Sequence, residues 1–120
     1  MASIFDLLTT EKCEPVGEFF IRYLSALERD KFEEHWQKYR QNKNTVFGIR
    51  GFMVAFCLSD AEGNPEFNSG DGESPTNEFI ETANKIGSIP AAKIQTLFSK
   101  AMEINGFSKN DVEELEKKSH

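Results

Sequence analysis

The stretch Val46-Phe-Gly-Ile-Arg-Gly-Phe-Met-Val-Ala-Phe-Cys-Leu58 places ten apolar side chains in thirteen positions and contains a single charged residue, Arg50. The pattern fits a buried strand or a buried helix. A buried strand usually spans about 4 to 8 residues, so the length favours a helix. Gly48 and Gly51 would cost this helix about 1 kcal/mol each and would let a neighbouring helix approach closely. A chain of 120 residues has room for one such element, so the run is predicted to be the central core helix.

Two residues within this run have their own interpretations. Cys57 is predicted to be a small core residue. Arg50 can lie near a helix end, with its stem along apolar surface and its guanidinium group in water. Alternatively, Arg50 anchors an interface with a partner. The sequence favours the first interpretation and leaves the second open.

Upstream of the run, the sequence predicts a strand and then a helix. Aromatic and β-branched residues between Val16 and Leu24, bounded by Pro15 and Gly17, favour a short strand. Ser25 and Glu28 have the spacing of a capping box, in which each side chain accepts a hydrogen bond from the other residue's backbone N–H. The helix that starts there is predicted to end between Gln41 and Asn44.

Aromatic residues follow this cap at helical spacing. Phe32, Trp36 and Tyr39 lie four and three residues apart and form a stripe on one face of the helix. Such a stripe belongs to the core more often than to an interface, but an exposed stripe would form a partner-binding face. A second apolar cluster, at residues 4–8, is either one helical turn or a detached docking strip.

Downstream of the run, residues 60–76 are predicted to be a polar loop because Gly, Ser, Asn and Pro are frequent there. The spacing of their carboxylates and glycines does not match a calcium-binding EF-hand loop. Three helices are predicted to follow, each marked by local start or stop signals: from Ser74-Pro75 to Gly87, from Ser88-Ile-Pro90 to Asn105-Gly106, and from a cap at Ser108 and Asp111 onward.

These segments predict a single mainly α domain over residues 1–120. About five helices are expected to pack on a central apolar helix, after a short N-terminal strand or β-hairpin. Residues 1–24 are its N-terminal strand or arm region, and residues 60–76 its polar loop. Cys13 and Cys57 lie far apart and have no metal-binding or redox motif, so both are expected to be reduced thiols.

Composition and residue spacing argue against several functional classes. Asp and Glu outnumber Lys and Arg by 20 to 14, which gives a net charge of -6, so binding to nucleic acid or to an anionic membrane is not expected. No apolar stretch reaches the roughly 18 residues that a membrane span requires. His35 and His120 have no nucleophile or carboxylate at a catalytic spacing and are expected to be solvated. No catalytic residue, metal ligand or cofactor is therefore predicted, which favours a binding or assembly module.

Three segments of the sequence, taken in order, carry a resemblance to a known protein family: Arg22-Tyr-Leu-Ser-Ala-Leu-Glu-Arg-Asp-Lys-Phe-Glu33, Val54-Ala-Phe-Cys-Leu-Ser-Asp-Ala-Glu-Gly-Asn-Pro-Glu-Phe67, and Leu97-Phe-Ser-Lys-Ala-Met-Glu-Ile-Asn-Gly-Phe-Ser-Lys-Asn-Asp-Val-Glu-Glu-Leu115. They resemble corresponding phrases of the tail assembly chaperones of long-tailed (siphovirus-type) bacteriophages. The resemblance extends from Arg22 to the C-terminus. The chain departs from the family pattern in the loop at residues 68–76 and in the segment before Arg22.

The resemblance implies a mainly helical, non-enzymatic protein of the host bacterial cytoplasm. Such a chaperone binds the tape-measure protein, keeps it soluble, helps to recruit tail-tube subunits and is absent from the finished virion. A homo-oligomer, either a ring or a spiral, is also implied. The candidate partner-binding residues are Phe19, Arg22, Phe32, Trp36, Tyr39 and Arg50.

Two other classes stay open. A structural tail component, such as a tube or head–tail joining subunit, would be rich in β-sheet. A small helical regulatory or DNA-binding module would bind DNA with a steep dependence on salt.

Overall fold

The computed structural model describes residues 12–41 and 48–117 of the chain. The apolar cluster at residues 4–8, the first two residues of the Val46–Leu58 run and His120 lie outside the described residues. The elements follow the order β1 (Cys13–Val16), β2 (Phe19–Arg22), α2 (Ala26–Gln41), α3 (Ile49–Cys57), β3 (Leu58–Ser59), α4 (Asn77–Gly87), α5 (Ala91–Ile104) and α6 (Lys109–Lys117). The predicted mainly α class with a short N-terminal hairpin is confirmed.

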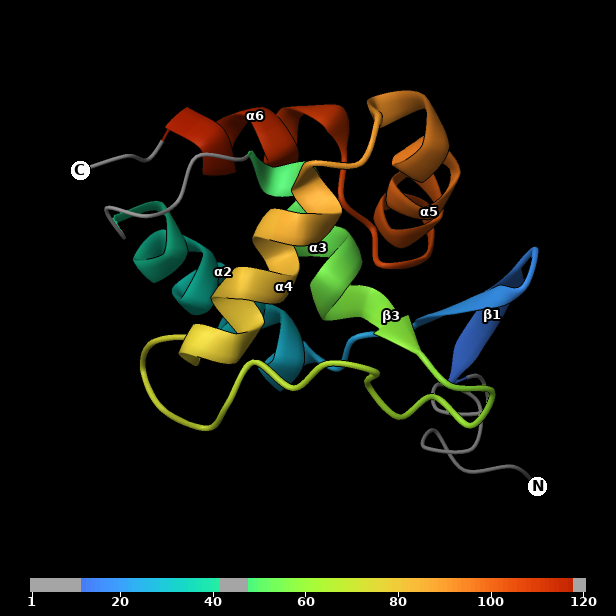
Figure 1. Ribbon diagram of the computed structural model, residues 1–120, viewed down its shortest axis with the longest axis horizontal. Coiled ribbons are helices and arrows are strands. Elements are labelled where there is room, and N and C mark those ends of the chain that lie inside the picture. Colours follow the sequence, from blue (N-terminus) through green and yellow to red (C-terminus); the bar gives the residue numbers. More distant parts are fainter. Residues whose placement is uncertain (1–11, 42–47, 118–120) are drawn as a thin grey trace, which may run out of the picture.

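The central position of α3 follows from its composition. Every residue of α3 except Arg50 is buried, and a helix that is apolar on all sides must be enclosed by other elements. Figure 1 shows α3 in the middle of the molecule, with the other helices around it. Burial raises the pKa of the Cys57 thiol to about 12, so this residue stays neutral. The prediction of a small core residue is confirmed.

Of the two predicted forms of the segment before α2, a single strand or a β-hairpin, the structure has the hairpin. Gly17 occupies the turn with φ 62, a conformation that glycine adopts without steric cost. Pro15, which the sequence predicts to bound the strand, lies within β1. Leu58, predicted as the end of the core helix, instead pairs with Ile21 and adds β3 to the antiparallel sheet in the order β1-β2-β3.

Gly51 lets α3 and α4 approach each other closely. A Cβ atom built on Gly51 would lie 2.6 Å from the Cα atom of Gly87 and 2.8 Å from the carbonyl oxygen of Ala83. The predicted close approach is confirmed for Gly51. It is wrong for Gly48, which precedes α3 as its N-cap residue: among the described residues, an added Cβ there would meet the Glu116 carboxylate alone, at 3.6 Å.

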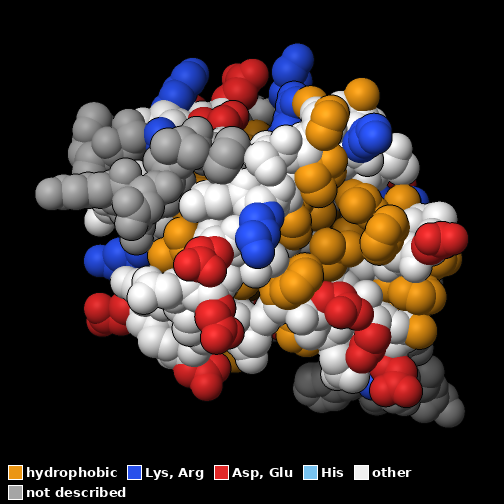
Figure 2. Space-filling view, in the orientation of Figure 1, with side chains coloured by type: hydrophobic (Ala, Val, Ile, Leu, Met, Phe, Trp, Pro, Cys, Tyr) orange, Lys and Arg blue, Asp and Glu red, His pale blue; other side chains and the backbone are white. Residues whose placement is uncertain are grey.

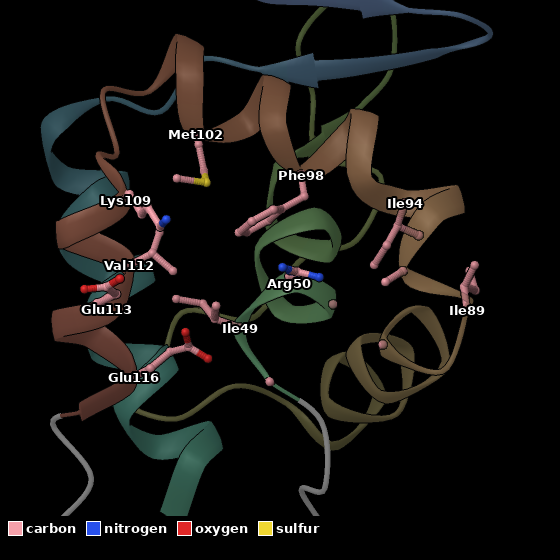
Figure 3. Close-up of a pocket in the computed structure, with 14 residues that line it drawn as sticks. Ile49, Arg50, Ile89, Ile94, Phe98, Met102, Lys109, Val112, Glu113 and Glu116 are labelled. Atoms are coloured by element: carbon pink, nitrogen blue, oxygen red, sulfur yellow. The ribbon is translucent and has the colours of Figure 1, made fainter.

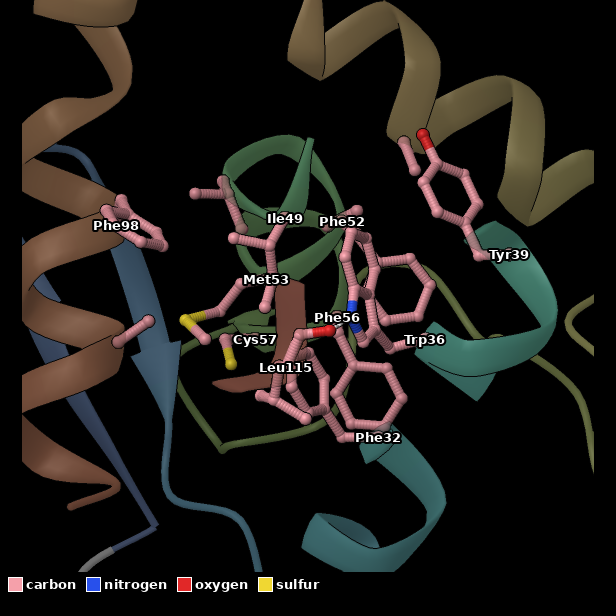
Figure 4. Packing of buried hydrophobic residues seen from close by; sticks show 14 of the residues in the cluster. Phe32, Trp36, Tyr39, Ile49, Phe52, Met53, Phe56, Cys57, Phe98 and Leu115 are labelled. Atoms are coloured by element: carbon pink, nitrogen blue, oxygen red, sulfur yellow. Dashed lines mark hydrogen bonds between the residues drawn. The ribbon is translucent and has the colours of Figure 1, made fainter. Parts of the chain in front are cut away.

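The aromatic stripe of α2 packs into the core against α3. Phe32, Trp36 and Tyr39 are 0%, 2% and 0% exposed, and Figure 4 shows all three directed toward the Phe52 and Phe56 side of α3. The Trp36 indole N–H donates a hydrogen bond to the carbonyl oxygen of Leu115 at 3.0 Å, which satisfies its polar group inside the core. The core interpretation is therefore confirmed. The alternative, an exposed partner-binding face made by these three residues, is wrong because the core uses their surface.

Two capping boxes begin helices where the sequence predicts them. The Ser25 N–H donates to Glu28 Oε1 at 2.9 Å, and the Glu28 N–H donates to Ser25 Oγ at 3.1 Å. Ser108 and Asp111 form the same pair of bonds at 2.8 and 3.0 Å, at the start of α6. Both predictions are confirmed. They could be made from the sequence because these bonds join groups only three residues apart and need no tertiary partner.

The start of α4 differs from the prediction. Thr76 is the N-cap residue, and its hydroxyl accepts a hydrogen bond from the Phe79 N–H at 3.2 Å. Pro75 is therefore outside the helix and not at its first position. The Thr76 N–H donates to the Ser69 carbonyl oxygen at 3.0 Å, and this bond ties the N-cap residue to the preceding loop.

The predicted end of α5 at Asn105-Gly106 is confirmed, and Asn105 also joins distant parts of the chain. Gly106 has φ 69, as expected for a glycine after a helix end. The Asn105 side chain accepts a hydrogen bond from the Leu24 N–H at 2.7 Å and donates one to the Arg22 carbonyl oxygen at 3.2 Å. The end of α5 is thereby tied to the connection between β2 and α2.

His35 is buried and not solvated, so that prediction is wrong. It is 0% exposed, and its Nδ1 and Nε2 atoms lie 2.9 Å from Ser69 Oγ and 2.7 Å from the Gly72 carbonyl oxygen. A carbonyl oxygen can only accept, so Nε2 donates to Gly72, and in the neutral ring Nδ1 accepts from the Ser69 hydroxyl. These partners lie 34 and 37 residues along the chain, beyond the reach of a local sequence pattern.

His35→Leu is expected to lower the free energy of unfolding by about 2 kcal/mol, because the Ser69 hydroxyl and the Gly72 carbonyl lose their buried partner. Protease cleavage within residues 60–76 should increase as well. Urea denaturation and limited proteolysis measure the two effects. The double variant with Ser69→Ala should lose less stability than the sum of the single variants. Fully additive losses would show that the two side chains do not depend on each other.

Candidate functional site

A groove lined largely by apolar side chains lies between the N-terminal turn of α3 and the helices α5 and α6. It encloses about 490 Å³. We call it the α3–α5–α6 groove. Figure 3 shows Lys109, Val112, Glu113 and Glu116 of α6 facing Ile49 and Arg50 of α3 across it. Its apolar lining comprises Ile49, Ile89, Ala91, Ile94, Phe98, Met102 and Val112.

Local sequence signals place these elements around the groove. The three residues 88–90 connect α4 to α5, so α5 begins close to the end of α4. Ile94, Phe98 and Met102 recur every four residues and form one continuous stripe on α5. The capping box at Ser108 starts α6 soon after α5 ends. On α6, Val112 lines the groove, and both Val112 and Leu115 belong to the main core.

The rim of the groove carries charges of both signs. Arg50 and Lys109 are cationic, Glu113 and Glu116 are anionic, and all four side chains are exposed. Within residues 12–41 and 48–117, none of them forms an ion pair. These charges are therefore available to groups outside the described chain.

Arg50 is placed as the first interpretation of the sequence predicts. It is the second residue of α3 and is exposed, and its Cζ atom lies 5.5 Å from the centre of the Phe98 ring. A guanidinium group over an aromatic face gains a cation–π attraction and keeps its N–H donors accessible. The same position lies on the groove, so the second interpretation, an interface anchor, stays a prediction.

Arg22 has an internal role and does not form an exposed partner-binding site, which contradicts its prediction. It is buried, and its Nε and Nη2 atoms donate to the Phe56 carbonyl oxygen at 3.0 and 2.8 Å. Its Nη1 atom forms an ion pair with Glu28. Partial burial opposes ionisation of Glu28, but the hydrogen bond from the Ser25 N–H and the charge of Arg22 outweigh it and hold the pKa of Glu28 below its usual value. Arg22 thus joins the end of α3 to the start of α2.

Phe19 is the remaining predicted residue, and it lies on a different surface. It is 53% exposed at the start of β2 and lines a second cavity with Phe20, Leu58 and Phe67. Of the six candidate residues, the structure thus leaves Phe19 and Arg50 accessible, and it does not bring them together.

The groove residues of α5 and α6 are not among the site residues predicted from the sequence. One signal was present, because the apolar residues of α5 cover a stripe wider than one helix contact requires: Ile94, Leu97, Phe98, Ala101 and Met102. Part of this stripe faces the groove, while Ala101 is fully buried. Which part remains uncovered depends on the direction of α6, and no local pattern specifies that direction.

Other kinds of site are not found in the described part of the chain. Residues 12–41 and 48–117 contain no group of three or more His, Cys, Asp or Glu side chains that could hold a metal ion. None of the described helices combines the length and apolar character needed to cross a bilayer.

Comparisons of the chain with protein-family models, with curated proteins and with solved structures give no match.

Proposed function

We propose that the chain is an assembly chaperone that binds an amphipathic helix of a partner protein in the α3–α5–α6 groove. The observation that carries this proposal is an open apolar groove whose four rim charges form no ion pair within the described residues. Helix-in-groove recognition places the apolar face of a partner helix on such a surface. Acidic residues beside that apolar face would pair with Arg50 and Lys109, and basic residues beside it would pair with Glu113 and Glu116.

The sequence resemblance adds a class of chaperone and a partner protein to this proposal. We propose a tail assembly chaperone whose groove ligand is the tape-measure protein, and whose role is to keep that protein soluble and help recruit tail-tube subunits. The protein would act without enzymatic activity in the host bacterial cytoplasm, as a homo-oligomer. The net charge of -6 supports a solubilising role, because like-charged complexes repel one another.

Co-expression with the tape-measure protein of the same genome tests the proposal. We expect the tape-measure protein to stay in the soluble fraction with this chain and to aggregate without it. The combined Arg50→Glu and Ile89→Asp substitutions should weaken the complex by about tenfold or more, because they remove a cationic anchor and an apolar contact at the groove.

The matched control combines Lys85→Glu on α4 with Leu27→Asp on α2. These residues are exposed, lie outside the groove and undergo the same kinds of change. The control variant should retain the complex, and circular dichroism should show both variants folded. Equal binding by the two variants would exclude the groove as the binding site, and aggregation of the tape-measure protein in the presence of the unaltered chain would exclude the chaperone function.

A further inference from the structure

A second apolar surface lies at the opposite end of α3 from the groove. It encloses about 460 Å³ and is lined by Phe19, Phe20, Leu58 and Phe67 together with Ser59, Ala61 and three acidic residues. We call it the hairpin patch. Figure 2 shows hydrophobic side chains gathered over the sheet and the neighbouring α5, with acidic side chains beside them.

The aromatic side chains of the hairpin patch are unusually accessible. Phe19 is 53% exposed and Phe67 is 37% exposed, although both are large apolar residues that would gain free energy from burial. They come from different parts of the chain, the hairpin and the 60–76 loop, and meet only in the folded protein. Their exposed surface is therefore available to a partner.

The charges around the hairpin patch have one sign. Glu18, Asp60 and Glu66 line it, and among the residues that the structure describes no Lys or Arg does. Within residues 12–41 and 48–117, none of the three carboxylates forms an ion pair. Asp60 Oδ1 accepts hydrogen bonds from the Glu62 and Asn64 N–H groups at 2.9 and 3.0 Å, and these bonds fix its carboxylate in place.

We propose that the hairpin patch binds an extended segment of a second partner, with apolar or aromatic side chains at its centre and Lys or Arg residues on both sides of them. The apolar side chains would cover Phe19 and Phe67, and the flanking cations would pair with the three carboxylates. This charge complementarity favours such a segment over residues 1–11 of the chain itself, which contain Asp6 and Glu11 and no Lys or Arg.

The hairpin patch and the groove have no lining residue in common. The groove includes the residues at the start of α3, and the patch includes Leu58, which follows the end of α3. The nine residues of α3 separate the two sites by about 13 Å. The inference does not depend on the identity of the groove ligand.

Binding of synthetic peptides to the full chain tests this inference by fluorescence anisotropy. The probe has Phe and Leu at its centre and lysines at both ends. One control peptide has glutamates in place of the lysines, and another has serines in place of Phe and Leu. We expect the probe to bind at least about tenfold more tightly than either control peptide, and its affinity should fall as salt is added.

Variants locate the binding site. Phe19→Ser and Glu66→Lys should each weaken binding by about fivefold or more, whereas Leu27→Ser and Glu81→Lys, which make comparable changes at exposed positions elsewhere, should leave it unchanged. Arg50→Glu should also have no effect on peptide binding, which separates this site from the groove.

Three outcomes would overturn the inference. The first is equal binding of the probe and either control peptide. The second is an equal loss of affinity in the Glu66→Lys and Glu81→Lys variants, because that would indicate a response to the net charge of the protein alone. The third is a rise in affinity when Phe5→Ser is introduced, which would show that the N-terminal segment occupies the patch.

Discussion

Replacing Phe52 with alanine is expected to lower the free energy of unfolding by about 4 kcal/mol, the largest loss for any single aromatic residue of the core. Phe52 is fully buried in α3. Its ring centre lies 4.9 Å from that of Tyr39, 5.4 Å from that of Phe32 and 5.5 Å from that of Trp36. The substitution would leave a cavity among rings that belong to α2 and α4 as well as α3, and these helices cannot all move to fill it. Urea denaturation followed by circular dichroism measures the loss.

Phe19→Ala is the matched control for this prediction. It removes the same ring from a position that is 53% exposed, so it should change the free energy of unfolding by no more than about 0.5 kcal/mol. If both variants lost similar amounts, Phe52 could not be the residue around which the aromatic core is organised. If Phe52→Ala is unfolded at all urea concentrations, Phe52→Leu provides a smaller change that still measures the burial.

Gly51→Ala is expected to lower the free energy of unfolding by about 3 kcal/mol. In an unobstructed helix the same change would stabilise the protein by about 1 kcal/mol, because alanine has the higher helix propensity. Here the new methyl group would lie 2.6 Å from the backbone N and Cα atoms of Gly87. Backbone atoms cannot rotate away as a flexible side chain can, so α3 and α4 must separate. Thermal and urea denaturation give the sign and the size of the effect.

Gly48→Ala provides the comparison for Gly51→Ala within the same segment. Its new methyl group would meet a Glu116 carboxylate oxygen at the ordinary contact distance of 3.6 Å. Alanine is a poorer N-cap residue than glycine, so the loss should not exceed about 1 kcal/mol. A gain in stability for Gly51→Ala would mean that α3 and α4 do not pack as closely as the structure shows.

Partner binding can be tested without disturbing the fold, because the tested positions lie on the surface and not in the core. Most positions chosen for binding experiments, among them Phe19, Arg50 and Glu66, are exposed, so their substitution should alter binding while the aromatic core stays intact. By contrast, Trp36 and Tyr39 cannot report on partner binding, because their replacement would first disturb the fold. Burial raises the pKa of the Tyr39 hydroxyl to about 12, and this hydroxyl donates a hydrogen bond to Asn84 Oδ1.

Several parts of the fold could be predicted because their determinants lie close together in the sequence. The capping boxes at Ser25 and Ser108 each use two residues three positions apart. The helix stop at Asn105-Gly106 depends on the positive φ of a glycine. The central helix followed from its own apolar composition, which left no face suited to water.

Other parts could not be predicted because their determinants meet only through packing. His35 stands among charged residues in the sequence, yet the 60–76 loop folds over it and supplies both of its hydrogen-bond partners. The N-cap residue of α4 is Thr76, and Pro75 is not part of the helix; the Thr76 backbone is bonded to Ser69, which lies in the preceding loop. Arg22 is drawn inward by the Phe56 carbonyl, 34 residues away.

The sequence by itself determined the helices, the caps of α2 and α6 and the burial of the segment that became α3. Each of these depends on hydrogen bonds within one helical turn or on the hydrophobicity of neighbouring residues. Only the tertiary structure decided that Phe32, Trp36 and Tyr39 belong to the core, and that Arg50 and Phe19 lie on separate surfaces. The reason is physical: whether a side chain is buried or available to a partner depends on which helices pack over it, and those helices come from distant parts of the chain.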